Sequence, residues 1–334
     1  MTGWIVISLG DVTGIGPEVT LKALAAELAA DDTRYLLIGD GTVLGGLNQE
    51  LKLNLPLIPF HGRQEAGRIF VHEPAAGALS DRPAPGCAAA ARASLAWLSE
   101  GARRCLSGEV DALVTAPVNK GSILRTGQRF IGQTEFLTEL AGAQDTAMML
   151  LGQDDRQRWL RVVLATTHVA LKRVADHLST SGITRIIQRA AQACRELGLP
   201  AARVGVCGLN PHAGEEGALG DEESRFIAPA VRAAREQGFD VTGPWPADTL
   251  FYRAYRGDFD IVVAMYHDQG LGPLKMIAFE TGVNWTIGLP FIRTSPDHGT
   301  AYDIAGQNVA HPGSMIAAIR LARQLVRNRA SPVQ

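Results

Sequence analysis

Short apolar runs alternate along the chain with longer segments whose apolar residues recur at helical spacing. Apolar runs of strand length predict β-strands, and we expect them at 4–9, 35–38, 112–115, 147–151, 160–166, 203–207, 261–265 and 283–287. Helical spacing predicts α-helices, and we expect these at 17–30, 85–106, 180–197, 222–237 and 314–327. Strands that alternate with helices are typical of an α/β fold with a largely parallel sheet.

The chain has 334 residues, of which 46% are hydrophobic and 20% charged, and its formal net charge is −2. This length favours two lobes over one compact domain. Lys and Arg are scattered among Asp and Glu without a long basic run, so we expect no nucleic-acid partner. We find no signal peptide and no uncharged apolar stretch long enough to cross a membrane.

The cysteines lack the paired spacing that disulfide frameworks and zinc sites have. They are Cys87, Cys105, Cys194 and Cys207. We expect buried thiols rather than disulfides or metal ligands. Together with the absence of an export or membrane segment, this pattern predicts a cytoplasmic protein.

His168, His212 and His267 each come just after an expected strand, far apart along the chain. Ligand sites in α/β folds gather at the carboxyl ends of strands. The wide separation excludes a zinc finger, whose ligands come in close pairs, and suits a catalytic metal site with three protein ligands. A lone histidine is more often a structural hydrogen-bonding residue. The spacing therefore leaves metal binding and a structural role both open.

A fourth polar segment, 289–301, combines a cation with a candidate phosphate loop. The planar guanidinium of Arg293 suits phosphate or carboxylate. His298, Gly299 and Thr300 precede an expected helix at 301–307, whose first N–H groups can hold a dinucleotide phosphate. Taken alone, this signal is not specific.

Three turns contain further candidates. Residues 10–18 have the glycines of a tight strand-to-helix turn but match neither GxGxxG nor a Walker loop. A purely structural turn is at least as good an interpretation as a ligand contact. Polar residues of 130–136 lie beside a glycine at an expected helix start. Asp248 lies in an expected turn. We interpret it as a helix cap in preference to a catalytic base or a neighbour of the metal ion.

These segments, in this order, resemble the 4-hydroxythreonine-4-phosphate dehydrogenase family of pyridoxal phosphate biosynthesis (the PdxA family). The similarity runs over almost the whole chain. Its most specific pieces are 208–215, 265–270 and 289–301. The other matching pieces are 10–18, 115–120, 132–136, 165–168, 246–251 and 282–284.

The resemblance implies an isocitrate and isopropylmalate dehydrogenase-like α/β fold, with the active-site cleft between two α/β/α lobes. Residues 1–129 and 287–334 would form the outer lobe, and 130–286 the inserted lobe with the metal histidines and the dimer interface. The resemblance also implies a homodimer with its active site at the subunit interface. It implies NAD or NADP as cofactor, bound without a Rossmann fingerprint, and one divalent metal ion per subunit (Zn, Mg or Co).

Carried over position by position, the resemblance assigns candidate site residues. The metal ligands are His168, His212 and His267. The substrate contacts are Gln133, Thr134, Lys275, Asn284 and Arg293. The catalytic candidates are Asp248 and Lys275, and the cofactor residues are His298, Gly299, Thr300 and Asp303.

Gln133 departs from the family pattern, because many members have histidine at this position. Glutamine can donate a hydrogen bond to a phosphate oxygen, but it cannot carry a positive charge or shuttle a proton. A phosphate-binding role survives the change, whereas an obligatory acid or base does not. We favour the phosphate-binding role, since Thr134, Lys275, Asn284 and Arg293 remain.

The family reaction is the NAD(P)-dependent oxidation of 4-phosphooxy-L-threonine to a 3-keto acid. This product loses carbon dioxide to give 3-amino-2-oxopropyl phosphate, on the way to pyridoxine 5'-phosphate. The first alternative is a dehydrogenase of a phosphorylated sugar acid, 4-phospho-threonate or 4-phospho-erythronate, or of an aromatic cis-dihydrodiol. More remote alternatives are an enzyme like the phosphate acyltransferases, which share a related fold but need no such metal site, and a non-catalytic binding protein.

Overall fold

The computed structural model describes residues 3–74, 79 and 83–330 and divides into two compact units. The first unit comprises Met1–Gln144 and Leu289–Ala330, and the second comprises Asp145–Gly288. The boundaries predicted from the sequence are 129/130 and 286/287. In the structure, residues 130–144 lie in the first unit and not in the second. The ends of the expected outer lobe, 1–2 and 331–334, fall outside the described residues.

The first unit contains a parallel sheet with the strand order β3-β4-β2-β1-β5-β12. Its strands are β1 (Trp4–Ser8), β2 (Arg34–Ile38), β3 (Leu57–Pro59), β4 (Ile69–His72), β5 (Ala112–Thr115) and β12 (Ile292–Pro296). Every residue of β1, β5 and β12 is buried. Such continuous burial is typical of parallel strands that helices cover on both faces.

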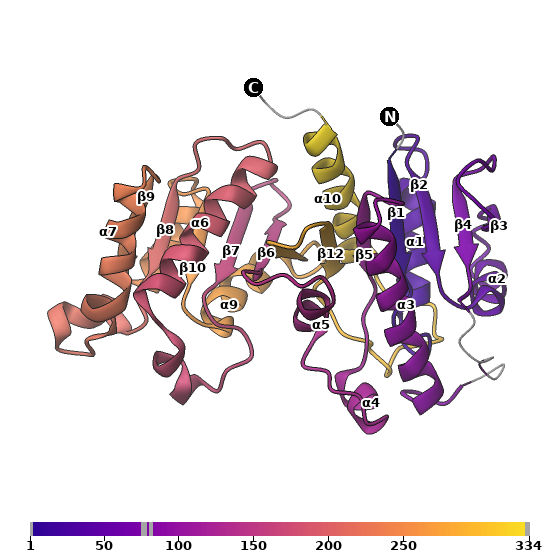
Figure 1. The fold of residues 1–334 in the computed structure, drawn as a ribbon, viewed down its shortest axis with the longest axis horizontal. Coiled ribbons are helices and arrows are strands. Elements are labelled where there is room, and N and C mark those ends of the chain that lie inside the picture. The colour runs from indigo at the N-terminus through magenta and orange to yellow at the C-terminus, as the bar shows by residue number, and fades with distance from the viewer. Residues whose placement is uncertain (1–2, 75–78, 80–82, 331–334) are drawn as a thin grey trace. The chain divides into compact units, whose positions relative to one another are not determined.

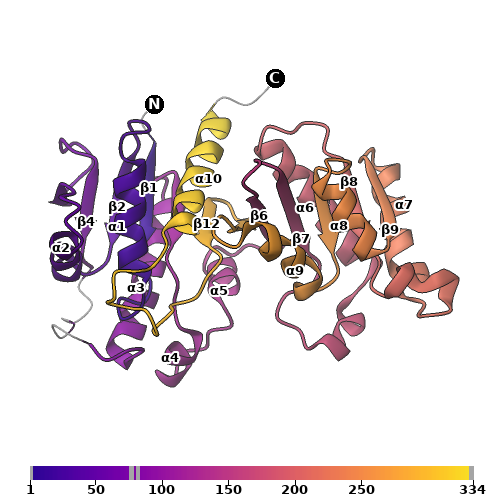
Figure 2. The same cartoon turned by 180° about the vertical axis from the view of Figure 1, so that it is seen from behind.

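Helices lie on both faces of this sheet. They are α1 (Gly16–Glu27), α2 (Gly41–Glu50), α3 (Ala88–Leu106), α4 (Lys120–Arg125), α5 (Gln133–Leu140) and α10 (Gly313–Ala330). Helix α3 covers the face turned toward the viewer in Figure 1, and α1 and α10 cover the opposite face, which Figure 2 shows. The side chain of Asn119 accepts a hydrogen bond from the Ser122 N–H at 2.8 Å, which starts α4 directly after β5.

The second unit contains a mixed sheet with the strand order β11-β6-β7-β10-β8-β9. Its strands are β6 (Ala147–Gln153), β7 (Trp159–Leu164), β8 (Val204–Cys207), β9 (Val241–Trp245), β10 (Ile261–Ala264) and β11 (Val283–Ile287). Strand β6 runs antiparallel to both of its neighbours, β7 and β11. The pairs β7–β10, β10–β8 and β8–β9 are parallel.

Four α-helices cover this second sheet. They are α6 (Thr180–Glu196), α7 (Ala228–Glu236), α8 (Ala247–Tyr255) and α9 (His267–Ala278). Short helical turns join them at Leu171–Arg173, Ala175–His177, Pro211–Gly217 and Glu223–Ile227. Helices α6 and α7 lie on one face of the sheet, and α8 and α9 lie on the other (Figures 1 and 2).

Most sequence-based elements are confirmed within a few residues, and the α/β class with a largely parallel sheet is confirmed. The helix expected at 301–307 is wrong. This segment consists of turns (Figure 2, between β12 and α10). Ala301 has φ +43 and Asn308 has φ +61, and a residue with positive φ cannot continue a right-handed helix.

The four cysteines are free thiols, as predicted. Three of them are buried, and Cys87 is half-buried. Burial raises the pKa of the Cys105 and Cys207 thiols far above their ordinary value and raises the pKa of Cys194 to about 12. These three thiols therefore stay protonated and unreactive at neutral pH. In the described part of the chain, no helix combines the length and apolar character that a membrane span requires.

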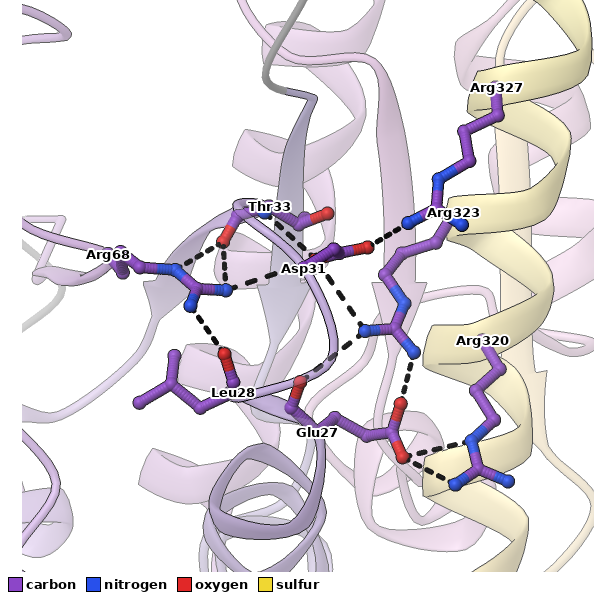
Figure 3. Close-up of polar contacts among 8 residues, drawn as sticks. All are labelled: Glu27, Leu28, Asp31, Thr33, Arg68, Arg320, Arg323 and Arg327. Atoms are coloured by element: carbon purple, nitrogen blue, oxygen red, sulfur yellow. Dashed lines mark hydrogen bonds and ion pairs between the residues drawn. The ribbon is translucent and has the colours of Figure 1, made fainter.

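A network of ion pairs joins the end of α1 to α10 (Figure 3). Glu27 is 2% exposed and pairs with Arg323, which is 8% exposed, and with Arg320 at 2.7 Å. A carboxylate at the C-terminal end of a helix meets the negative end of the helix dipole. The two arginines offset this repulsion and the desolvation of the buried carboxylate. The network therefore ties α1 and α10 together on one face of the first sheet.

The neighbouring carboxylate extends the network across the strands. Asp31 pairs with Arg323, Arg327 and Arg68 (Figure 3). Arg68 also donates to the backbone carbonyl oxygens of Thr33, at 3.0 and 3.2 Å, and of Leu28. The Leu28 carbonyl lies at the end of α1, where a helix leaves acceptors without intrahelical partners.

The buried and exposed arginines of this network should differ in their contribution to stability. We expect Arg323→Met to lower the free energy of unfolding by about 3–5 kcal/mol, because Glu27 keeps its charge in a buried place. Arg320→Met is the matched control. The Arg320 side chain is 63% exposed, so we expect a loss of about 1 kcal/mol or less. Urea unfolding of both variants measures the difference, and equal losses would contradict this account.

Candidate active site

A buried guanidinium lies at the centre of the polar residues in the first unit. Arg293 of β12 is 2% exposed. Its Nη2 donates to Thr115 Oγ1 at 2.7 Å and to Gln133 Oε1 at 3.1 Å, and its Nε donates to Thr115 Oγ1 at 3.2 Å. Burial lowers the pKa of Arg293 to about 10, against the opposing charge of Glu135. The group still carries its positive charge at neutral pH.

Gln133 and Thr134 are the first two residues of α5, after the extended Gly132. The Gln133 amide donates to the Ala116 carbonyl at 3.1 Å while its oxygen accepts from Arg293. Thr134 is 9% exposed. The first N–H groups of a helix favour a negative charge. The start of α5 and the guanidinium are thus both favourable to a negative charge, and the predicted residues Gln133 and Arg293 are in direct contact.

The candidate cofactor residues lie on the loop that joins β12 to α10. Thr300 is 8% exposed, His298 is half-buried, and Gly299 and Asp303 are exposed. A Cβ at Gly299 would meet no atom within 4 Å, so the backbone is open to a ligand. A carboxylate such as Asp303 can accept hydrogen bonds from ribose hydroxyls. This donor and acceptor set fits a nicotinamide dinucleotide, although no helix begins here.

The three candidate metal ligands all belong to the second unit. His168 follows β7, His212 follows β8 and His267 begins α9 after β10. The rings of His168 and His267 lie with their centroids 6.0 Å apart and their planes at 39°. Among the residues that the structure describes, no group of three or more His, Cys, Asp or Glu side chains could hold a metal ion. A single chain therefore brings two of the three imidazoles near each other.

Carboxylates orient two of these imidazoles. His267 Nδ1 lies 2.7 Å from Asp268 Oδ1, and His212 Nδ1 lies 2.6 Å from Glu215 Oε1. The hydrogen bond and charge of Glu215, with a smaller contribution from Asp248, raise the pKa of His212. A carboxylate on one ring nitrogen leaves the other nitrogen for a ligand, as in metal-bound histidines.

His212 lies in a segment of left-handed backbone. The non-glycine residues of this segment with positive φ are His212, Ala213, Glu215 and Glu216. Left-handed conformation costs roughly 1–2 kcal/mol for each such residue. The surrounding contacts must therefore hold the segment in place.

Glu223 supplies these contacts and was not identified from the sequence. It is 6% exposed and accepts from the backbone N–H groups of Leu209 and Asn210 at 2.7 and 2.8 Å. Its second oxygen accepts from the Asn210 amide at 3.0 Å. The side chain comes from the short turn that precedes α7, so no local sequence signal links it to His212.

The remaining candidates lie on α8, α9 and β11. The cap interpretation of Asp248 is wrong, because the N-cap of α8 is Pro246 and Asp248 Oδ1 accepts from the Thr249 N–H within the first turn. Lys275 lies on α9, with its Nζ 6.0 Å from the ring centroid of Phe279. The Oδ1 of Asn284 is buried and has no hydrogen-bond partner among the described residues. A buried acceptor without a donor is typical of a position that a ligand completes.

Polar side chains at the carboxyl ends of strands, in two α/β units, define a ligand-binding enzyme of the α/β class. The family model for "Pyridoxal phosphate biosynthetic protein PdxA" matches residues 31–322. The chain therefore belongs to the PdxA family.

Similar proteins include named dehydrogenases. A D-threonate 4-phosphate dehydrogenase of Cupriavidus necator is 43% identical, over 97% of each chain. A 4-hydroxythreonine-4-phosphate dehydrogenase of Desulfosudis oleivorans is 44% identical, over 95% of this chain and 94% of the relative. The crystal structure of a putative 4-hydroxythreonine-4-phosphate dehydrogenase from Salmonella typhimurium has a TM-score of 0.85 and 39% identity, over 97% of this chain and all of that chain. The family and the isocitrate dehydrogenase-like fold inferred from the sequence are confirmed.

Proposed function

We propose that this chain is a metal-dependent NAD(P) dehydrogenase that oxidises the C3 hydroxyl of 4-phosphooxy-L-threonine in the synthesis of pyridoxine 5'-phosphate. The resulting 3-keto acid loses carbon dioxide and leaves 3-amino-2-oxopropyl phosphate. The observation that carries this proposal is the buried Arg293 guanidinium beside Gln133 at the start of α5. Relatives at 42–44% identity over nearly the whole chain bear the name of this activity.

The substrate carries a phosphate and a carboxylate, and the chain offers two cations for them. Arg293 is a fixed cation whose guanidinium suits a phosphate or a carboxylate. Lys275 adds a second positive charge, and Gln133 and Thr134 add neutral groups. Asn284 is a further contact, because its buried Oδ1 lacks a donor in the described residues and can accept from the substrate's ammonium or hydroxyl group. Binding these remote groups fixes C3 relative to the nicotinamide ring.

His168, His212 and His267 are the proposed holders of one divalent ion, Zn, Mg or Co. Neutral imidazoles are common ligands of such ions, and the 6.0 Å separation of the His168 and His267 rings supports a shared ion. The ion, when bound, polarises the substrate oxygen and stabilises negative charge on it. We assign Asp248 as the candidate acceptor of the hydroxyl proton. Lys275 counterbalances the charge of the substrate anion near the reacting carbon.

We also propose that two chains form a homodimer in the cytoplasm and that each subunit completes the other's site. A cavity of about 660 Å³ lies beside α8 and α9, lined by Asp248 and by mostly apolar residues. Of its lining residues, Tyr252 and Met276 are 61% and 82% exposed, and Phe279, at the end of α9, is 76% exposed. Large apolar side chains exposed together usually mark an interaction surface. A second copy of the chain would cover these side chains. It would also bring a third imidazole to the two that one chain supplies.

A sugar acid 4-phosphate is the second candidate substrate. One relative at 43% identity is named a D-threonate 4-phosphate dehydrogenase. Gln133 keeps this possibility open, because it differs from the histidine of many family members. Such a substrate has a hydroxyl where 4-phosphooxy-L-threonine has an amine, and the phosphate, the carboxylate and the oxidised carbon are shared.

A cofactor-reduction assay distinguishes these possibilities. We expect metal-loaded enzyme to reduce NAD or NADP with 4-phosphooxy-L-threonine. Chelation should lower kcat/KM by about 100-fold or more, because a Lewis acid contributes several kcal/mol to such a step. Added divalent metal should restore the rate. A faster rate with 4-phospho-D-threonate would transfer the assignment to the sugar acid, and turnover that survives chelation would refute the metal role.

Mixing two inactive variants tests the shared site. We expect His212→Ala and His267→Ala to be inactive alone. After subunit exchange, a mixed dimer holds one site with both defects and one site with none. Activity should therefore return to roughly a quarter of the wild-type value, since about half of the dimers are mixed and each has one intact site. If each chain supplied all three ligands to its own site, every site would carry a defect and the mixture would stay inactive.

A further inference from the structure

The loop between β12 and α10 is anchored at both of its ends by the 10–22 segment. Figure 2 shows this loop in gold as a long segment without helix. It contains the candidate cofactor residues His298, Gly299, Thr300 and Asp303. The 10–22 segment comprises the glycine-rich turn after β1 and the first half of α1. The sequence alone does not show whether this turn has a role beyond its own structure. The contacts of the turn with the loop indicate such a role.

A buried carboxylate connects the turn to the near end of the loop. Asp11 is 1% exposed. Its Oδ1 accepts from the N–H of Thr13 at 2.9 Å and from the Thr13 hydroxyl at 2.6 Å, and its Oδ2 accepts from the Tyr302 hydroxyl at 2.5 Å. Thr13 Oγ1 also accepts from the Gly86 N–H at 2.8 Å. Burial and the carboxylate raise the pKa of Tyr302, so the phenol keeps its proton and is the donor.

The backbones of the turn and the loop also touch directly. The Ile15 N–H donates to the Thr300 carbonyl at 3.0 Å. A Cβ at Gly14 would lie 2.6 Å from that oxygen and 2.9 Å from the Thr300 Cβ. Glycine is thus required at this position because the loop passes too close for any side chain. Gly14 therefore serves the contact with the loop as well as the turn itself.

Helix α1 anchors the far end of the same loop. Glu18 is 3% exposed and accepts from the Ala310 N–H at 2.9 Å and from Lys22 Nζ at 2.7 Å. Lys22 Nζ donates to the carbonyls of Asn308 and Ala310, each at 3.0 Å. Ala301 and Asn308, near the two ends, have positive φ. Such strained residues persist only where surrounding contacts hold them.

We propose that Asp11 and Tyr302 form a latch that positions the 298–303 loop for the nicotinamide cofactor. The inference rests on the proposed function, because it takes these loop residues as the cofactor contacts. Tyr302 lies between Thr300 and Asp303 in sequence. The contact that holds Tyr302 therefore also fixes the backbone of these two residues. A preformed loop lowers the cost of ordering on binding. Neither residue needs to touch the cofactor.

The variant Tyr302→Phe removes one hydroxyl and nothing else. We expect the dissociation constants for NAD and NADP, measured by titration calorimetry without substrate, to rise about ten-fold, which corresponds to about 1.4 kcal/mol. We expect KM for the cofactor to rise while kcat and KM for the phosphorylated substrate stay unchanged. In the cofactor-free protein the Ile15 amide should exchange its hydrogen faster, because its acceptor Thr300 is released. The Ala310 amide, held by Glu18, should keep its rate.

The matched control is Tyr35→Phe, a buried tyrosine on β2 of the same unit. We expect it to change neither cofactor affinity nor Ile15 exchange. Asp11→Asn is the second variant of the latch. In a double-mutant cycle Tyr302→Phe should have little further effect in the Asp11→Asn background. Additive effects of the two substitutions would overturn the latch.

The outcomes separate this inference from the proposed function. If the wild-type protein binds cofactor and Tyr302→Phe binds it equally well, the latch is refuted and the proposed function stands. If the wild-type protein binds neither NAD nor NADP, the proposed function fails, and with it the cofactor role of the latch. Faster exchange at Ile15 in Tyr302→Phe would then support an anchor for the loop alone.

Discussion

The burial of one guanidinium governs the architecture of the first unit. A charged group removed from water is stable only where acceptors surround it, and Arg293 finds them on Thr115 and Gln133. Thr115 ends β5, which pairs in parallel with β12, and Gln133 begins α5. Three segments far apart in sequence must therefore meet correctly before this charge can be buried. A core built this way holds a cation in a fixed position, which is the basis of its proposed role in substrate binding.

The two units carry different parts of the proposed chemistry. The first unit holds the Arg293 cluster and the cofactor loop, and the second holds the three histidines with Asp248, Lys275 and Asn284. In each unit, secondary contacts position residues that act on ligands. Glu223 holds Leu209 and Asn210, just before the left-handed backbone of His212, and Asp11 holds Tyr302 within the proposed cofactor loop. Side chains without a reactive role thus determine where the reactive ones lie.

The sequence predicts the parts of this structure that local patterns encode. Apolar runs predict the central strands, and strand ends predict the segments of the three histidines and Arg293. Gln133 is a candidate through the family resemblance, and its contact with Arg293 is visible only in the structure. Contacts between residues far apart in sequence could not be predicted in this way. The helix expected at 301–307 is absent because the backbone at Ala301 is left-handed, and Glu223 was missed because its partners lie across a turn. The meeting of all three histidines stays a prediction, since one chain brings only two of them near each other.

The central claim is that the Arg293 guanidinium anchors the substrate anion, and the binding of 4-phosphooxy-L-threonine to Arg293→Lys tests it most directly. Lysine keeps the positive charge but offers no bidentate geometry. The account predicts that the dissociation constant for the substrate, measured by calorimetry on metal-loaded protein, rises about ten-fold or more, while NAD(P) affinity stays unchanged. Wild-type substrate affinity in a folded Arg293→Lys protein would contradict it.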